Sequence, residues 1–154
     1  MTESKKPAAR RPTAARAASA ASMKLLVVRL EPGEDLKLAL DELARRHEIE
    51  AGVIVTCVGS LRRAALRLAD GKSVRTWEQP FEIVSLVGTL SATGGSHLHV
   101  GLAGSRGSAI GGHLCEGSLV NTTAEIAVGL LPDLRFAREP DERTGYRELK
   151  VSTQ

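Results

Sequence analysis

Three of the four histidines of this 154-residue chain lie close together in a glycine-rich stretch. His97 and His99 are two positions apart, and His113 follows on a later segment, two residues before Cys115. Residues two apart in a β-strand face the same side, about 7 Å apart at their backbones, so such side chains can lean toward one point. Three converging imidazoles with an open fourth position are typical of a catalytic zinc site, whereas a thiolate in that position would make a closed, structural site.

The same residues also fit a purely structural role, in which the histidines hydrogen-bond one another and the backbone in the core or at a subunit interface. Gly111 and Gly112, next to His113, would allow a backbone or a ligand to approach closely, or would mark a β-bulge. Glu82 and Glu125 lie in otherwise apolar or hydroxylic strands. Each would serve as a partner that orients an imidazole, as a general base, or as a structural carboxylate paired elsewhere. The residues themselves leave these alternatives open.

One helix and many consecutive strands must position these side chains. After an apolar run at 23–30, a stripe with the spacing of an amphipathic helix recurs at Leu36, Ala39, Leu40, Leu43 and Ala44. Glu34 and Asp35 precede it, where negative charge suits the positive end of a helix. From residue 51 the apolar period changes to two, which predicts strands at 52–60, 64–69, 73–77, 81–91, 97–103, 110–116, 118–131, 134–138 and 146–151. This order predicts an α+β domain on a largely antiparallel sheet.

The composition fits one domain with a proper core, since 42% of the residues are apolar. Four aromatic residues are few for a protein that would stack the bases of single-stranded nucleic acid. The two cysteines, Cys57 and Cys115, do not make a disulfide framework, which predicts a reducing, cytoplasmic compartment. Cys57 is predicted to be a small core residue. No apolar run approaches the roughly 20 residues that span a membrane, so no membrane association is expected.

The net positive charge of the chain lies in residues 1–22. These residues carry five basic side chains against Glu3, a net charge of +4, which leaves a net charge of −1 on 23–154. Without apolar periodicity, the segment is predicted to be disordered. It would be a solvated extension, an Arg- and Ser-rich transit peptide, or an arm that contacts DNA through Lys5, Lys6, Arg10, Arg11 and Arg16. Met23 stands where the folded pattern begins and would also serve as a start of translation.

Three segments resemble a known family, the plant and prokaryote conserved (PPC) domain. They are 81–91 (FEIVSLVGTLS), 97–114 (HLHVGLAGSRGSAIGGHL) and 117–126 (GSLVNTTAEI), and their most specific part is GGHL with the upstream HLH. The family is the domain of plant AT-hook nuclear proteins and also occurs alone in bacteria. Because 33–61 fits in order and spacing as well, the resemblance predicts a PPC-like domain over 23–151 behind the tail at 1–22.

The resemblance implies a compact α+β domain, usually a homotrimer in prokaryotes, with the histidine cluster near a subunit boundary. Some bacterial members hold a metal ion, typically zinc, on histidines that match His97, His99 and His113. The family is commonly described as DNA-binding, a description that rests on the AT-hooks of the plant proteins. An AT-hook centres on Arg-Gly-Arg-Pro, and the nearest stretch here, 9–12 (ARRP), lacks the glycine. Any contact with DNA is therefore assigned to the basic tail.

Three functions remain open after these observations. The favoured one is a trimeric PPC-like protein that holds zinc on its histidines and acts as a regulatory or DNA-associated protein. The second is a small zinc-dependent enzyme of unknown substrate, with Glu82 or Glu125 as acid–base group. The third is an assembly module whose histidines are structural. Cys115 is left out of the ligand set, because reaching the metal would require strict strand alternation to continue past the glycines.

Overall fold

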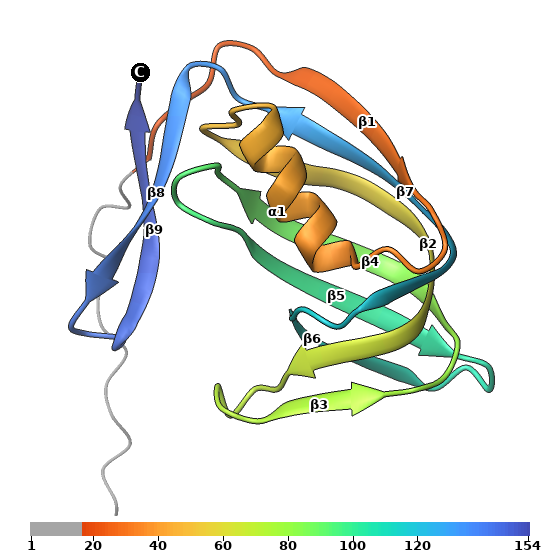
Figure 1. Ribbon diagram of the computed structural model, residues 1–154. Coiled ribbons are helices and arrows are strands. Elements are labelled where there is room, and N and C mark those ends of the chain that lie inside the picture. Colours follow the sequence, from red (N-terminus) through yellow and green to blue (C-terminus); the bar gives the residue numbers. More distant parts are fainter. Residues whose placement is uncertain (1–16) are drawn as a thin grey trace, which may run out of the picture.

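The computed structural model describes residues 17–154 (Figure 1). The five basic residues assigned to a DNA contact lie outside the described residues, so that assignment stays a prediction. Within the described part, one helix, α1, spans Leu36–Arg46. The strands are β1 Lys24–Leu30, β2 Gly52–Arg67, β3 Val74–Trp77, β4 Phe81–Leu90, β5 His97–Gly104, β6 Ala109–Leu114, β7 Leu119–Leu130, β8 Leu134–Asp141 and β9 Tyr146–Thr153.

Most of these strands form one antiparallel sheet in the order β1-β7-β2-β4-β5-β6, with β3 paired to β2. Strands β8 and β9 form a separate hairpin. Figure 1 shows α1 lying across one face of the large sheet, with the hairpin to one side of it. The predicted architecture, one helix on a largely antiparallel sheet, is confirmed. No helix among the described residues is long and apolar enough to cross a membrane.

Strand β2 differs from the prediction. The sequence predicted two strands, at 52–60 and 64–69, with a turn between them, but β2 continues for 16 residues. Three shifts of register, at Ile54/Thr56, Gly59/Leu61 and Leu61/Arg63, bend β2 without ending its pairing with β7. Gly59 has φ +149°, and a Cβ there would lie 2.1 Å from the carbonyl oxygen of Thr123. The residues that indicated a turn therefore produce a bend within one strand.

The bend brings the end of β2 back onto β6, where Leu66 pairs with Leu114 and Arg67 with His113. Strands β2, β4, β5 and β6 thus form a closed ring of pairings. Gly112 permits this approach, since a Cβ on it would lie 2.7 Å from the carbonyl oxygen of Arg67. The predicted role of the glycine pair in a close backbone approach is confirmed at Gly112.

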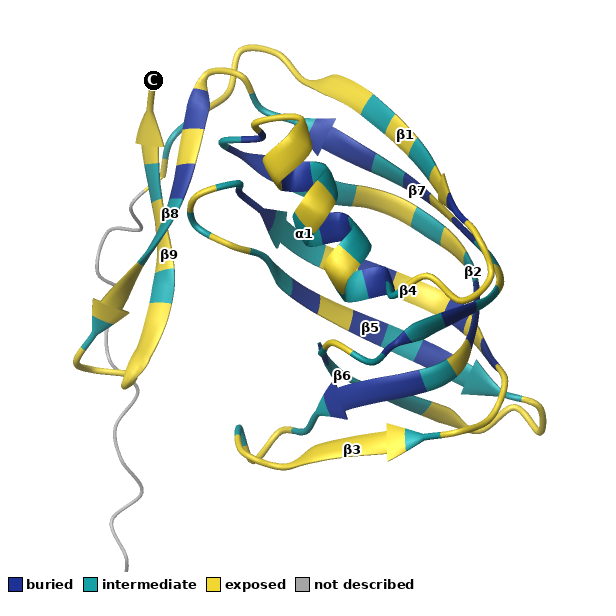
Figure 2. Ribbon diagram, in the orientation of Figure 1, coloured by how far each residue is buried: buried dark blue, intermediate teal, exposed yellow. Residues whose placement is uncertain are grey.

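The main core lies between α1 and the sheet. The apolar stripe of α1 buries Leu36, Leu40 and Ala44 against the inward residues of the strands. Figure 2 shows this pattern, with buried segments beneath the helix. The opposite side of the sheet carries a row of apolar residues that are at least half exposed, here called the outer apolar face: Leu25, Val27, Val55, Val58, Val84 and Val87.

A smaller cluster holds the base of the β8–β9 hairpin on the body. Ala51, Leu134 and Phe136 are buried together, and Ala18 packs against them. The Phe136 backbone N–H donates to the Glu50 carbonyl at 2.9 Å, and the hydroxyl of Ser91 donates to the Phe136 carbonyl at the same distance. The hairpin is therefore anchored at its base and extends from there along the sheet (Figure 1).

Asp35 starts the helix and also fixes the loop that precedes β7. Its Oδ1 accepts from the backbone N–H groups of Lys37 and Leu38, at 2.9 and 3.1 Å. Its Oδ2 accepts from the N–H of Gly117 at 2.6 Å. One carboxylate thus caps α1 and ties it to the end of the segment that carries the histidines.

We expect Asp35→Ala to lower the free energy of unfolding by about 1–2 kcal/mol, because it removes a helix cap and leaves the N–H of Gly117 without its acceptor. Asp35→Asn keeps a capping oxygen and should lose less. Urea denaturation of both variants beside Glu42→Ala, which removes only exposed ion pairs with Arg45 and Arg46, measures the difference. Equal midpoints for Asp35→Ala and Glu42→Ala would contradict the assignment.

Candidate metal centre

The pairing of β5 with β6 brings the three histidines of the central stretch together. His99 and His113 are direct cross-strand partners. His97 lies two residues before His99 on the same side of β5, because Leu98 and Val100 are buried on the other side. The strand period alone therefore turns the two histidines of β5 outward, and the register of β6 adds the third.

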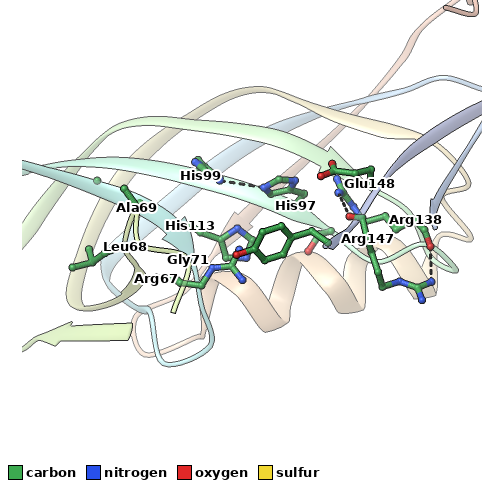
Figure 3. A pocket seen from close by; sticks show the side chains of 14 residues that line it. Arg67, Leu68, Ala69, Gly71, His97, His99, His113, Arg138, Arg147 and Glu148 are labelled. Carbon is green, nitrogen blue, oxygen red and sulfur yellow. Dashed lines mark hydrogen bonds between the residues drawn. The ribbon is translucent and has the colours of Figure 1, made fainter. Parts of the chain in front are cut away.

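The rings of His97, His99 and His113 form a compact triangle (Figure 3). Their centroids are 5.1, 5.1 and 5.4 Å apart. One ring nitrogen from each lies within 4.8 Å of the others. The Nε2 atoms of His97 and His99 are 3.1 Å apart, within hydrogen-bonding distance. Nitrogen donors that converge in this way can bind a single ion.

The surroundings keep two of these imidazoles neutral. Burial lowers the pKa of His113 to about 4, and the positive charge of Arg67 acts in the same direction. Burial also lowers the pKa of His97, with further contributions from Arg138 and from its neighbour His99. A neutral imidazole has a free lone pair on one ring nitrogen, which is the form that binds a metal ion.

The three histidine side chains are a suitable set of donors for the zinc ion that the sequence indicated. Nδ1 of His113 is buried and has no hydrogen-bond partner. A buried polar atom without a partner is unusual and is often explained by an ion or water at the site. Three imidazoles are also a ligand set that zinc uses when a position stays open for water or substrate. The residues present therefore fit a zinc ion.

Neither cysteine joins the cluster. Strand β6 ends at Leu114, and the backbone N–H of Cys115 donates to the carbonyl of Ala65 instead of continuing the pairing with β5. Strict alternation thus stops before Cys115, and its thiol lies 3.6 Å from the carbonyl of His113. Cys57 packs against the main core, as predicted, and burial raises its pKa to about 11.

Glu82 and Glu125, the candidate acid–base groups, do not lie with the histidines. Glu82 is exposed on β4 opposite Ala103, at the other end of β5 from His97. Glu125 is exposed on β7, which β2 and β4 separate from β5. Neither side chain lines the cavity beside the cluster. The geometry gives these carboxylates no contact with the histidines.

A cavity of about 690 Å³ adjoins the cluster. The histidines and the end of β2 line one side of it, and the β8–β9 hairpin lines the other with Arg138, Tyr146, Arg147 and Glu148. The hydroxyl group of Tyr146 lies next to Gly71, in the turn after β2. A Cβ on Gly71 would be 2.6 Å from the hydroxyl oxygen of Tyr146. Sequence reasoning missed these residues, because they are distant along the chain and follow no motif.

The chain matches the model of a known protein family. The model of the Plants and Prokaryotes Conserved (PCC) domain, the family named above as PPC, matches residues 17–132. The chain belongs to this family. The matched region includes all three histidines of the cluster and ends before the β8–β9 hairpin.

Known proteins similar to this PCC domain differ widely in length. The chain is 45% identical over 130 residues to the bifunctional protein GlmU of a Synechococcus strain, JA-2-3B'a(2-13). The aligned region covers 84% of the chain but only 20% of that protein. The chain thus spans about a fifth of the curated relatives that it matches.

Two solved structures share the fold of this PCC domain closely. A hypothetical protein from Salmonella enterica is 36% identical with a TM-score of 0.85, over 88% of this chain and 98% of the other. A metal-containing protein from Archaeoglobus fulgidus is 30% identical with a TM-score of 0.70, over 82% and 93%.

We expect the stability of the metal-free PCC domain to fall as the pH is lowered from about 6.5 to about 4. In this window the unfolded state takes up a proton on His113 that the folded state does not, so acid favours unfolding. Above this window both states are neutral at this residue and its contribution vanishes. Urea midpoints at several pH values, with a chelator present, should give a shallower pH dependence for His113→Asn than for the wild type. Identical slopes would show that burial does not depress this pKa.

Proposed function

We propose that this PCC-domain protein holds a zinc ion on His97, His99 and His113. The observation that carries the proposal is the convergence of three ring nitrogens within 4.8 Å, one of the imidazoles having a buried nitrogen without a partner. The similarity to a metal-containing protein of Archaeoglobus fulgidus supports it. When bound, the ion would supply Lewis acidity toward a ligand in the adjoining cavity. The chain's own part is to orient the imidazoles and keep them neutral.

We infer a homotrimer as the working assembly, the state that the family resemblance implies. The outer apolar face supports association with further copies of the chain. Its valines and Leu25 are between 50% and 72% exposed, on the side of the sheet that α1 leaves uncovered. Several large apolar side chains exposed on one face of a sheet are typical of a subunit interface. His99 borders this face, because it pairs with Val87, which would place the metal site close to the subunit boundary.

The cellular role that we propose is that of a regulatory or DNA-associated protein, with DNA contacted by the basic tail. The division of charge supports it, since 1–22 carry a net +4 and the remainder of the chain a net −1. A body with a net charge near zero attracts the DNA backbone weakly as a whole, whereas clustered lysine and arginine release counter-ions from it.

A second candidate is a small zinc-dependent enzyme, which the cavity beside the histidines favours. Its volume lies within the range of small-molecule sites, about 300–1,000 Å³. Glu148 lines it and would take the place of Glu82 and Glu125 as the nearest carboxylate. The acid–base role that the sequence gave to Glu82 or Glu125 receives no support from their positions.

The metal proposal predicts near-stoichiometric zinc in untagged wild-type protein. Zinc should be absent from His97→Ala and His113→Ala, because each removes one of three ligands. His47→Ala is the matched control, since His47 ends α1 and is exposed. Plasma mass spectrometry measures the metal, and light scattering of the same samples measures the assembly.

Two outcomes of this experiment would count against the proposals. A wild type that binds no metal after zinc loading while it stays folded would remove the metal centre. Loss of the trimer in His113→Ala, with no metal in the wild type, would instead assign the histidines to the interface.

The tail proposal predicts that DNA affinity depends on salt and on residues 1–22. Five basic contacts would give log Kd against log salt a slope of at most about 4.5 in magnitude. A chain of residues 23–154 should bind duplex DNA much more weakly in fluorescence anisotropy, as should a full-length variant with the five basic residues changed to glutamine. Binding by 23–154 with an unchanged salt slope would place the DNA contact on the folded body.

A further inference from the structure

The cavity beside the histidines has a cationic lining. Arg67 comes from the end of β2, and Arg138 and Arg147 come from the β8–β9 hairpin. Glu148 is the one acidic residue that lines the cavity within residues 17–154. Three guanidinium groups thus face one carboxylate. In Figure 3, Arg67 lies beside His113, and the hairpin arginines lie on the other side of the cavity.

The hydrogen bonds of the two hairpin arginines go to neutral acceptors. None of the ion pairs formed within 17–154 includes Arg67, Arg138 or Arg147. Arg138 instead donates to the hydroxyl of Thr89 at 3.2 Å and to the carbonyl of Arg147 at 3.4 Å. Arg147 donates to the carbonyl of Arg138 in return. Neutral acceptors orient these side chains but leave their charges uncompensated.

Arg67 and Arg138 are partly buried, whereas Arg147 is exposed. Burial lowers the pKa of Arg138, although the charge of Glu148 acts in the opposite direction. A divalent ion on neutral imidazoles would add more positive charge to the same cavity. Partly buried charge of one sign is costly until a counter-charge enters. An anion bound between these arginines would supply that counter-charge.

We propose that this cavity binds a small molecule through an oxyanion group, a phosphate or a carboxylate, held by Arg67, Arg138 and Arg147. Guanidinium groups donate two parallel hydrogen bonds to such a group, which a lysine cannot do. The cavity, at about 690 Å³, has the volume of a site for a metabolite-sized ligand. The inference rests on the proposed metal centre only in placing a zinc ion near the ligand. The three arginines would hold the anion without that ion.

Isothermal titration calorimetry with inorganic phosphate, methyl phosphate and succinate, on zinc-loaded and chelator-treated full-length protein, tests the proposal. We expect binding of at least one probe, and the preferred probe distinguishes a phosphate ligand from a carboxylate ligand. Arg67→Gln and Arg138→Gln should each weaken it about tenfold, the effect of losing a charge-assisted contact. Arg106→Gln, which changes an exposed arginine in the loop after β5, is the matched control and should bind as the wild type does.

Circular dichroism establishes that each variant is folded, and Arg147→Gln replaces any variant that is not. The proposal is overturned if no probe binds, or if the cavity variants and Arg106→Gln bind equally well. Binding of duplex DNA that weakens in Arg67→Gln and Arg138→Gln, with none of the small anions bound, would also overturn it, in favour of a nucleic-acid surface.

The metal content of the same samples separates this proposal from the preceding one. Anion binding that depends on Arg67 and persists in metal-free His97→Ala supports the anion site even if the metal centre fails. Zinc-loaded wild type that binds none of the probes removes the anion site and leaves the metal centre in place.

Discussion

The short pairing between the end of β2 and β6 is the constraint on which the site depends. Two residue pairs make it, Leu66 with Leu114 and Arg67 with His113. Because β6 also pairs with β5, these contacts fix His113 opposite His99 and place Arg67 beside both. The closure requires a bend at Gly59 and the absence of a side chain at Gly112. The sequence predicted separate strands at 52–60 and 64–69, whereas one continuous, bent β2 carries Leu66 and Arg67 onto β6.

The electrostatics of the site follow from this closure. Neutral imidazoles and charged guanidinium groups share one cavity, and the arginines help to keep the imidazoles unprotonated. This serves metal binding, because a protonated imidazole cannot be a ligand. The same positive charge would oppose a cation if nothing balanced it. An anion in the cavity would reconcile the two, so the metal and anion proposals describe complementary parts of one site.

The strand periodicity in the sequence was sufficient to predict that His97 and His99 share a face, but not that His113 joins them. Alternation of Leu98 and Val100 with His97 and His99 predicts which side chains share a face, and the structure brings His113 to that face. The boundaries of α1 and of most strands were predicted for the same reason, since local apolar patterns encode them. The continuity of β2 was not, because a bulge and a turn use the same residues. The arginine lining was not either, because it depends on the docking of the hairpin, which no local pattern encodes.

The two walls of the cavity come from different parts of the chain. The histidines and Arg67 belong to the region that the family model matches, whereas Arg138, Tyr146 and Arg147 follow residue 132, where that match ends. The hairpin makes its own two-stranded sheet and is anchored through a small apolar cluster. Exchange of this terminal segment would replace one wall of the cavity without altering the ring of strands. Relatives with the same histidine cluster would then be free to evolve different ligand preferences by changes confined to the last 22 residues.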